Sequence, residues 1–292
     1  MMKAALENYH ARMRRVLDHI DRHLDADLDL STLSGVAAFS KHHFQRQFSA
    51  TYGLSAHRYV QLARMKRASY RLAFRDDADV TEIASDAGYE APDSFARAFR
   101  DCVGQAPSAF RKSPDWEPWL AALEPLDQAR SANMTFSPND VVVRDFPATP
   151  VALLTHRGDQ ALVYETVRRF IDWRRAAGLG RDIAATYTIF PCDPRTTPPD
   201  AFHLDLCAAT IRPIEANAQG VVAGMIPGGR CAVLRVIGSS ENLERPALLL
   251  YRDWLPSSGR EARDFPLFCQ RISFYPDVPE QETITDLLLP IE

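Results

Sequence analysis

The sequence has no apolar run of 18 residues, the minimum length expected of a membrane-spanning helix. Its first residues, MMKAALENYHARMRR, lack the apolar stretch and cleavage site of a secretory leader. Cysteine is scarce, since five cysteines are scattered over 292 residues and none forms a C-x-x-C pair. We therefore expect a cytoplasmic protein without a membrane span, a disulfide framework, a metal site or a cofactor.

The chain also lacks a net positive charge, because 38 acidic residues outnumber 34 basic ones. Its two parts nevertheless differ in sign. The first 112 residues hold 17 basic and 14 acidic residues, whereas the rest of the chain holds 17 and 24. A mildly basic part joined to an acidic part disfavours sequence-independent nucleic-acid binding and fits binding to a specific DNA site.

Residues 31–112 contain the same helix pair twice. STLSGVAAF at 31–39 aligns with TEIASDAGY at 81–89, and the match continues after one inserted residue. A short helix, a tight turn and a second helix of this size form a helix-turn-helix unit. Two hairpins of an ordinary helical domain would explain the apolar spacing but not the repeated arginine. The matching positions are Phe44 and Phe95, Arg46 and Arg97, and Phe48 and Phe99.

The second helix of each unit is predicted to have an apolar and a polar face, because its phenylalanines are four residues apart. Ser40 is a suitable N-cap for the first of these helices, and Pro92 a suitable first residue for the second. Glutamine can pair with adenine, and arginine with guanine, in the major groove. The predicted DNA contacts are Lys41, His42, Gln45, Arg46, Asp93, Ser94, Arg97 and Arg100.

FSKHHFQRQF, YGLSAHRYV, RMKRASYRLA and IASDAGYEAPDSFARAFRDCVGQAPSAFRK make residues 29–112 similar to the AraC/XylS family of bacterial transcription regulators. Tyr89 departs from the family's usual phenylalanine, and Ala91-Pro92-Asp93 is an unusual start to the second reading helix. The resemblance implies double-stranded DNA as a partner, RNA polymerase as an expected second partner, and association with the nucleoid. A rigid joining helix at 56–74 would fix the distance between the reading helices, and a distance of about 34 Å would let one chain bind two successive major grooves as a monomer. A homodimer also stays open.

Residues 113–139 contain four prolines and follow neither a helical nor a strand period. We expect a linker there, with one short helix at 116–123. The predicted domains are therefore an all-α tandem helix-turn-helix domain at 1–112, which should fold and bind DNA alone, and a second domain at 140–292.

The second domain begins with strand-like segments, VVVRDF and VALLTH, and it also repeats itself. Residues 152–158 match 232–238, and residues 204–206 match 285–287, with a matching tryptophan and glycine between them. The sequence predicts an α+β domain made of two β-α-β-β units, with a ligand cleft between the units.

GGRCAVLRVIG, YRDWLPSSG, DFPLF and TDLLLPI make residues 141–291 similar to GyrI-like effector-binding domains. The resemblance implies that aromatic residues around a buried glutamate capture a small hydrophobic effector, which is often a cation. Cys269 takes the place of that glutamate and Arg271 that of a tyrosine, so we expect a preference for neutral or anionic ligands. The predicted effector contacts are Tyr187, Phe268, Cys269 and Arg271.

The loss of both motif residues also disfavours a hydrolase, and we expect no enzyme activity. Two alternatives stay open for the second domain: a protein-docking module, and a vestigial GyrI-like hydrolase.

Overall fold

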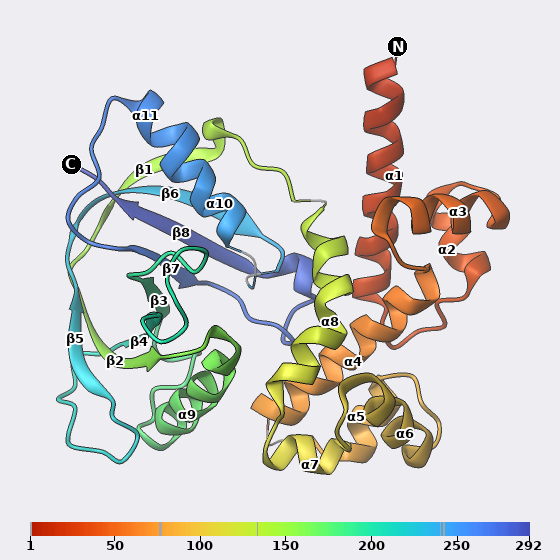
Figure 1. The fold of residues 1–292 in the computed structure, drawn as a ribbon, viewed down its shortest axis with the longest axis horizontal. Coiled ribbons are helices and arrows are strands. Elements are labelled where there is room, and N and C mark those ends of the chain that lie inside the picture. The colour runs from red at the N-terminus through yellow and green to blue at the C-terminus, as the bar shows by residue number, and fades with distance from the viewer. Residues whose placement is uncertain (1, 76–77, 133, 240, 242) are drawn as a thin grey trace. The chain divides into compact units, whose positions relative to one another are not determined.

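The computed structural model describes residues 2–75, 78–132, 134–239, 241 and 243–292 (Figure 1). The chain forms two compact units. The helical unit comprises Met1–Met134 and Tyr275–Gln281, and the sheet unit comprises Thr135–Phe274 and Glu282–Glu292. Within the described residues, no helix is both long and apolar enough to cross a membrane.

The helical unit confirms the predicted all-α fold with two helix-turn-helix units. In each helix-turn-helix pair a short helix precedes a 12-residue reading helix, and one long helix joins the two pairs. The helices are α1 (Met2–Arg22), α2 (Leu30–Ala37), α3 (Lys41–Tyr52), α4 (Ala56–Phe74), α5 (Val80–Asp86), α6 (Pro92–Val103), α7 (Pro107–Lys112) and α8 (Trp116–Ser131).

Helix α8 differs from the short helix that was predicted within a linker. It is 16 residues long, and its apolar residues at positions 116, 119, 123 and 126 are buried on one face. Trp116 stacks on Phe74 with ring centroids 5.7 Å apart, and it meets Phe110 edge-on at 5.5 Å. Pro125 lies inside the helix without ending it. Residues 116–131 are therefore part of the core of the helical unit.

The sheet unit contains one antiparallel sheet of eight strands in the order β1-β6-β8-β7-β3-β4-β2-β5. The strands are β1 (Val141–Phe146), β2 (Thr149–Arg157), β3 (Thr186–Phe190), β4 (His203–Ala209), β5 (Val222–Ile226), β6 (Gly229–Ile237), β7 (Leu267–Arg271) and β8 (Ile284–Pro290). Its longer helices are α9 (Val163–Ala176) and the continuous run of α10 (Glu244–Leu248), η3 (Leu249–Trp254) and α11 (Leu255–Ser258). Short helical turns are η1 (Pro138–Asp140), η2 (Gln160–Leu162) and η4 (Glu280–Glu282).

The predicted duplication of a β-α-β-β unit is confirmed by the strand pairing. In the first copy β2 and β3 both pair with β4, and in the second β6 and β7 both pair with β8. The two copies meet where β3 pairs with β7. The two-fold arrangement therefore brings β3 and β7, one from each copy, to the middle of the sheet.

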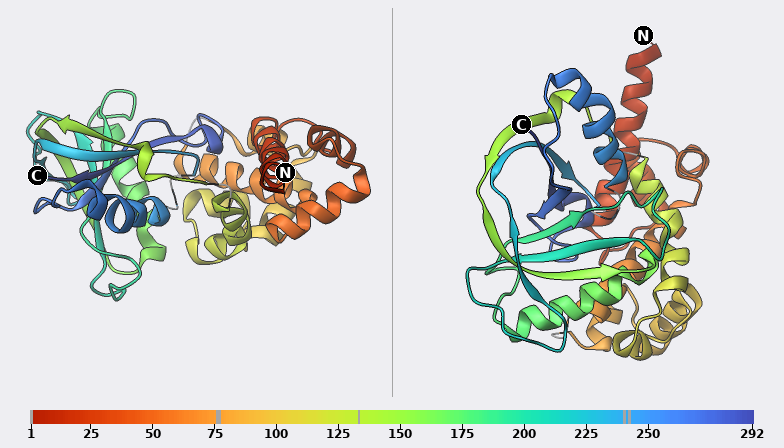
Figure 2. Two further views of the ribbon diagram at one scale, coloured as in Figure 1. Left: turned by 90° about the horizontal axis from the view of Figure 1, so that it is seen from above. Right: turned by 60° about the vertical axis from the view of Figure 1, so that its left-hand side comes forward.

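The two faces of this sheet are covered differently. Helix α9 packs over β2 and β4, and α10 with η3 packs over β6, β7 and β8, on the helix-covered face (Figures 1 and 2). The opposite face, which we call the strand-only face, buries a cluster whose members all come from strands. They are Phe146, Val151, Tyr187, Ile189, Cys207, Ile226, Cys231, Val233, Phe268 and Leu288.

Candidate functional site

Helix α3 is positioned by its cap and its two phenylalanines. The Ser40 hydroxyl accepts a hydrogen bond from the backbone N–H of His43 at 3.4 Å, which confirms the predicted N-cap. Phe44 and Phe48 are fully buried, with ring centroids 5.6 Å apart. Because these rings fix one face of the helix in the core, the opposite face points outward.

The predicted contacts of α3 lie on that outward face. Lys41, His42, Gln45 and Arg46 are all exposed. The side chains of Gln45 and Arg46 make no hydrogen bond or ion pair with any described residue. Their polar groups are therefore available to a partner, as major-groove recognition requires.

Helix α6 repeats this arrangement in the second unit. Pro92 is its first residue, as predicted, and Phe95 and Phe99 are fully buried with ring centroids 5.5 Å apart. Arg97 and Arg100 are exposed and make no ion pair within the described part of the chain. Asp93 and Ser94 are exposed in the first turn, so the whole predicted set lies on the outward face of α6.

The turns between the paired helices match in geometry as well as in sequence. Phe39 N–H donates to the Ser34 carbonyl at 3.0 Å, and the same bond forms at the same distance in the second copy. Both turns use a left-handed residue, Ala38 with φ 53° and Gly88 with φ 81°. A Cβ on Gly88 would lie 2.8 Å from an Arg64 guanidinium nitrogen, so a side chain there would displace the end of Arg64. The left-handed backbone also favours glycine at this position.

The arginines of the joining helix α4 bond to the protein itself. Arg64 donates to the carbonyls of Leu24 and Ala26 at 2.8 and 2.7 Å, which ties α4 to the connection between α1 and α2. Arg71 pairs with Glu82 at 2.8 Å and with Asp86, which ties α4 to α5. These contacts favour a positioning role for the positive charge of α4 over phosphate binding.

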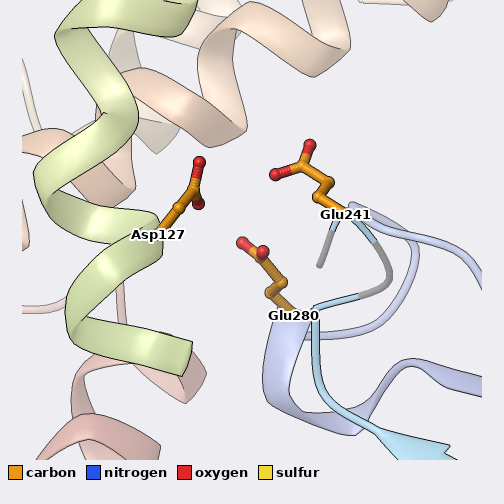
Figure 3. A group of neighbouring side chains, drawn as sticks. All are labelled: Asp127, Glu241 and Glu280. Carbon is orange, nitrogen blue, oxygen red and sulfur yellow. The ribbon is translucent and has the colours of Figure 1, made fainter. Parts of the chain in front are cut away.

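A buried cluster of charges lies within the helical unit. Lys66 of α4 has no exposed side-chain surface, and its Nζ bonds to Asp127 Oδ1 at 2.7 Å and to Glu280 Oε1 at 2.9 Å. Arg130 of α8 bonds to Asp21 Oδ1 at 2.6 Å and also to Glu280 Oε2. Figure 3 shows the Asp127 and Glu280 side chains. Because Lys66 Nζ already bonds to both carboxylates, a lysine ammonium occupies the position that a metal cation would need.

Burial and charge act in opposite directions within this cluster. Burial alone would lower the pKa of Arg130, but the carboxylates of Asp21 and Glu280 raise it well above its usual value. Burial raises the pKa of Asp21, and Arg130 opposes that rise. Each buried charge is therefore stabilised by its ion-pair partners. Removing one partner is expected to destabilise the cluster, because it leaves a buried charge without compensation.

The structure brings two of the four predicted effector contacts together. Tyr187 and Phe268 both lie on the strand-only face, with ring centroids 6.5 Å apart. Phe146 packs edge-on against both of them, at 5.9 and 5.0 Å. Burial raises the pKa of Tyr187, so its hydroxyl stays protonated near neutral pH.

Cys269 and Arg271 do not share that face. Cys269 belongs to the buried cluster beneath α10 and η3, where it packs among Leu250, Trp254 and Leu287. Side chains alternate along β7, so Arg271 lies on the same helix-covered face as Cys269. The structure therefore corrects the expectation that Arg271 enters the same site as Tyr187.

Four polar residues that sequence reasoning missed lie on the strand-only face: Gln270, Asp286, Asp205 and Arg235. Gln270 pairs with Tyr187 on one side and with Asp286 on the other, and Asp205 pairs with Ile189. Arg235 binds Asp286 through two hydrogen bonds of 2.7 and 2.8 Å. In a strand, neighbouring side chains point to opposite faces, so only the strand register shows that these polar residues share the face of Tyr187.

Asp205 differs from Asp286 in its partners. Its carboxylate accepts a hydrogen bond from the Thr155 hydroxyl at 2.6 Å and forms no ion pair with a described residue. It is half-buried and lies two residues from Cys207, in the floor of the strand-only face. This face therefore combines aromatic rings with a carboxylate that no cation of the described chain neutralises.

Residues 139–292 match the family described as the GyrI-like small molecule binding domain, which is more than half of the chain. The chain belongs to this GyrI-like family. Residues 33–113 match a second family, described as a helix-turn-helix domain. The protein is a transcription regulator that joins a helix-turn-helix DNA-binding domain to a GyrI-like small-molecule-binding domain.

This GyrI-like regulator is similar to curated and solved proteins in both parts. It is 37% identical over 153 residues to the probable transcriptional regulator YgiV of Escherichia coli K12, covering 52% of this chain and 96% of YgiV. The DNA-binding domain of AdpA, solved with a target DNA, is 27% identical with a TM-score of 0.33, covering 35% of this chain and 90% of that one. The EcmrR C-terminal domain is 14% identical with a TM-score of 0.43, covering 52% and 96%.

Proposed function

We propose that this GyrI-like regulator reads DNA through the outward faces of α3 and α6, and that a small hydrophobic cation on the strand-only face controls that activity. The first half rests on one observation: two equivalent polar faces are presented by helices that α4 ties together. Both reading helices lie in one chain, so a monomer suffices for two successive major grooves. RNA polymerase is the proposed partner of the DNA-bound form, which acts in the cytoplasm.

Arg46→Ala is expected to weaken binding to the specific site by about 1–3 kcal/mol and to relax the preference at one base pair. The reason is that an exposed arginine without an internal partner can bind both acceptors of a guanine edge. The measurement is a fluorescence-anisotropy titration with a duplex that the full chain selects from a randomised pool.

The matched control is Arg58→Ala, because Arg58 is an exposed arginine that already hydrogen bonds to Gln61 at 2.8 Å. It should leave the base preference unchanged. If Arg46→Ala binds the selected duplex as the unaltered chain does, with the same base preference, Arg46 does not read a base.

The proposed effector class follows from the charges of the strand-only face. Tyr187 and Phe268 are 6% and 0% exposed, so their rings lie in the buried core of this face. Asp205 is a half-buried carboxylate without an ion pair in the described chain. Aromatic faces and a partly desolvated carboxylate both attract an apolar cation. This replaces the preference for neutral or anionic ligands expected from the sequence, because that preference required Arg271 to lie on this face.

Tetraphenylphosphonium and tetraphenylborate test the proposal, because they match in size and differ in the sign of their charge. We expect the full chain to bind the cation in preference to the anion, and Asp205→Asn to weaken cation binding at least about tenfold, since one close charge pair is lost. Calorimetry measures both ligands. The control is Asp193→Asn, which removes an exposed carboxylate already paired with Arg195 at 2.7 Å.

Tighter binding of tetraphenylborate, or cation binding that survives Asp205→Asn unchanged, would contradict the cation proposal. Binding of neither ion, together with normal DNA binding, would instead favour the protein-docking alternative for the sheet unit.

A further inference from the structure

The helical unit is completed by a segment from far along the chain. Residues Tyr275–Gln281 belong to this unit, although they lie between strands β7 and β8 of the sheet unit. The Tyr275 ring packs edge-on against Tyr70 of α4 at 5.0 Å, and Gln281 Nε2 donates to the Asp18 carbonyl of α1 at 3.2 Å. The segment therefore contacts two helices of the DNA-binding part.

Glu280 is the buried residue of this segment. Its two carboxylate oxygens bond to Lys66 of α4 and Arg130 of α8. Arg130 in turn binds Asp21 of α1 and donates to the Tyr59 hydroxyl at 3.2 Å. The Glu280 carboxylate thus connects α4 to α8 directly, and to α1 through Arg130.

The same segment is continuous with two strands that carry the strand-only face. The strand before it, β7, contributes Phe268 and Gln270 to that face, and the strand after it, β8, contributes Asp286 and Leu288. Only three residues separate Arg271, at the end of β7, from Tyr275. Tyr275–Gln281 is therefore the backbone connection between these two strands, and it carries Glu280.

We propose that Tyr275–Gln281 couples effector occupancy of the strand-only face to DNA affinity, with Glu280 as the positioning residue that sets α4. The ligand half of this inference rests on the effector class proposed above, but the role of Glu280 in DNA binding does not. Coupling of this kind requires that the ligand bind two states of the segment with different affinity.

The first measurement uses the full chain without ligand. Glu280→Gln keeps the shape of the side chain and removes its charge, and we expect at least about tenfold weaker binding to the selected duplex. Asp277→Asn is the control in the same segment, because Asp277 is exposed and forms its 2.9 Å ion pair with Arg75 near the surface. This substitution should change DNA affinity less than about twofold.

The second measurement adds saturating tetraphenylphosphonium and follows DNA affinity again. The DNA affinity of the unaltered chain should change at least about threefold, whereas that of Glu280→Gln should stay the same. Calorimetry should find that both chains bind the cation equally well. Asp127→Asn is the control for a loss of stability. It removes another carboxylate bound to Lys66, one that belongs to α8, and its DNA affinity should still change when the cation is added.

If Glu280→Gln is less stable than the unaltered chain, hydrogen exchange of the α4 amides still tests the coupling. We expect the cation to slow this exchange in chains that contain Glu280 and to leave it unchanged in Glu280→Gln. Normal DNA affinity and a normal response in Glu280→Gln would overturn the proposal. If the unaltered chain does not bind tetraphenylphosphonium, the effector class is wrong, and the ligand-free DNA measurement still decides the role of Glu280.

Discussion

A fragment that ends at Lys112 is expected to lack a stable fold and to bind the selected duplex far more weakly than the full chain. The fragment loses α8, whose buried Trp116, Trp119, Leu123 and Leu126 pack in the helical unit. Removing side chains of this kind costs about 2–5 kcal/mol each, so the total is comparable to the stability of a whole domain. Circular dichroism and an anisotropy titration measure the two losses.

A longer fragment separates the contribution of α8 from that of Glu280. The fragment 1–134 regains α8 but not Glu280, and it should show helical structure with lower stability and lower DNA affinity than the full chain. A cooperative, fully helical 1–112 fragment that binds the duplex as tightly as the full chain would restore the domain division expected from the sequence.

Trp119→Ala in the full chain is expected to lower the free energy of unfolding of the helical unit by about 3–5 kcal/mol. The Trp119 ring is only 1% exposed, and it packs against Trp116 and Tyr70 with centroid distances of 5.3 and 5.9 Å. Its loss leaves a cavity between α8 and α4. Urea unfolding followed by the helical circular dichroism signal measures the effect.

The control is Glu124→Ala on the same helix. Glu124 is exposed and bonds to Gln128 at 2.9 Å, so its loss should cost only a few tenths of a kcal/mol. Equal small effects for both substitutions would show that α8 lies on the surface as a linker helix would.

The sequence predicted the elements whose residues carry a local period. The phenylalanines four residues apart identified the core faces of α3 and α6, and Ser40 and Pro92 marked where these helices begin. The repeated segments in the second half predicted the β-α-β-β duplication. Both patterns arise because a buried face must recur at the period of its own helix or strand.

Helix α8 was underestimated because proline was given more weight than the apolar spacing. Pro118 lies in the first turn, where a missing N–H removes no intrahelical bond. A proline at position 125 predicts the end of a helix, yet the apolar residues continue at three- and four-residue intervals on both sides of it. Tertiary packing of the two tryptophans explains why the helix persists.

The strand-only face shows how a shift of one residue along a strand changes the prediction of which side chains lie together. Matching a family motif to Cys269 placed it beside Tyr187, but in a strand the neighbouring residue faces the other way. The observed register pairs Tyr187 with Gln270, and Thr188 with Cys269. Strand pairing is a long-range property, so no local pattern in DFPLFCQR could have chosen between the two faces.

Glu280 lies 150 positions after Arg130 in the chain, and this separation matters during synthesis. At about 5–20 residues per second, the ribosome needs on the order of 10 s to add the residues that supply this carboxylate. The helical unit therefore stays incomplete until the β7–β8 connection has emerged. A chain that terminates early therefore cannot complete its helical unit before most of the sheet unit has been synthesised.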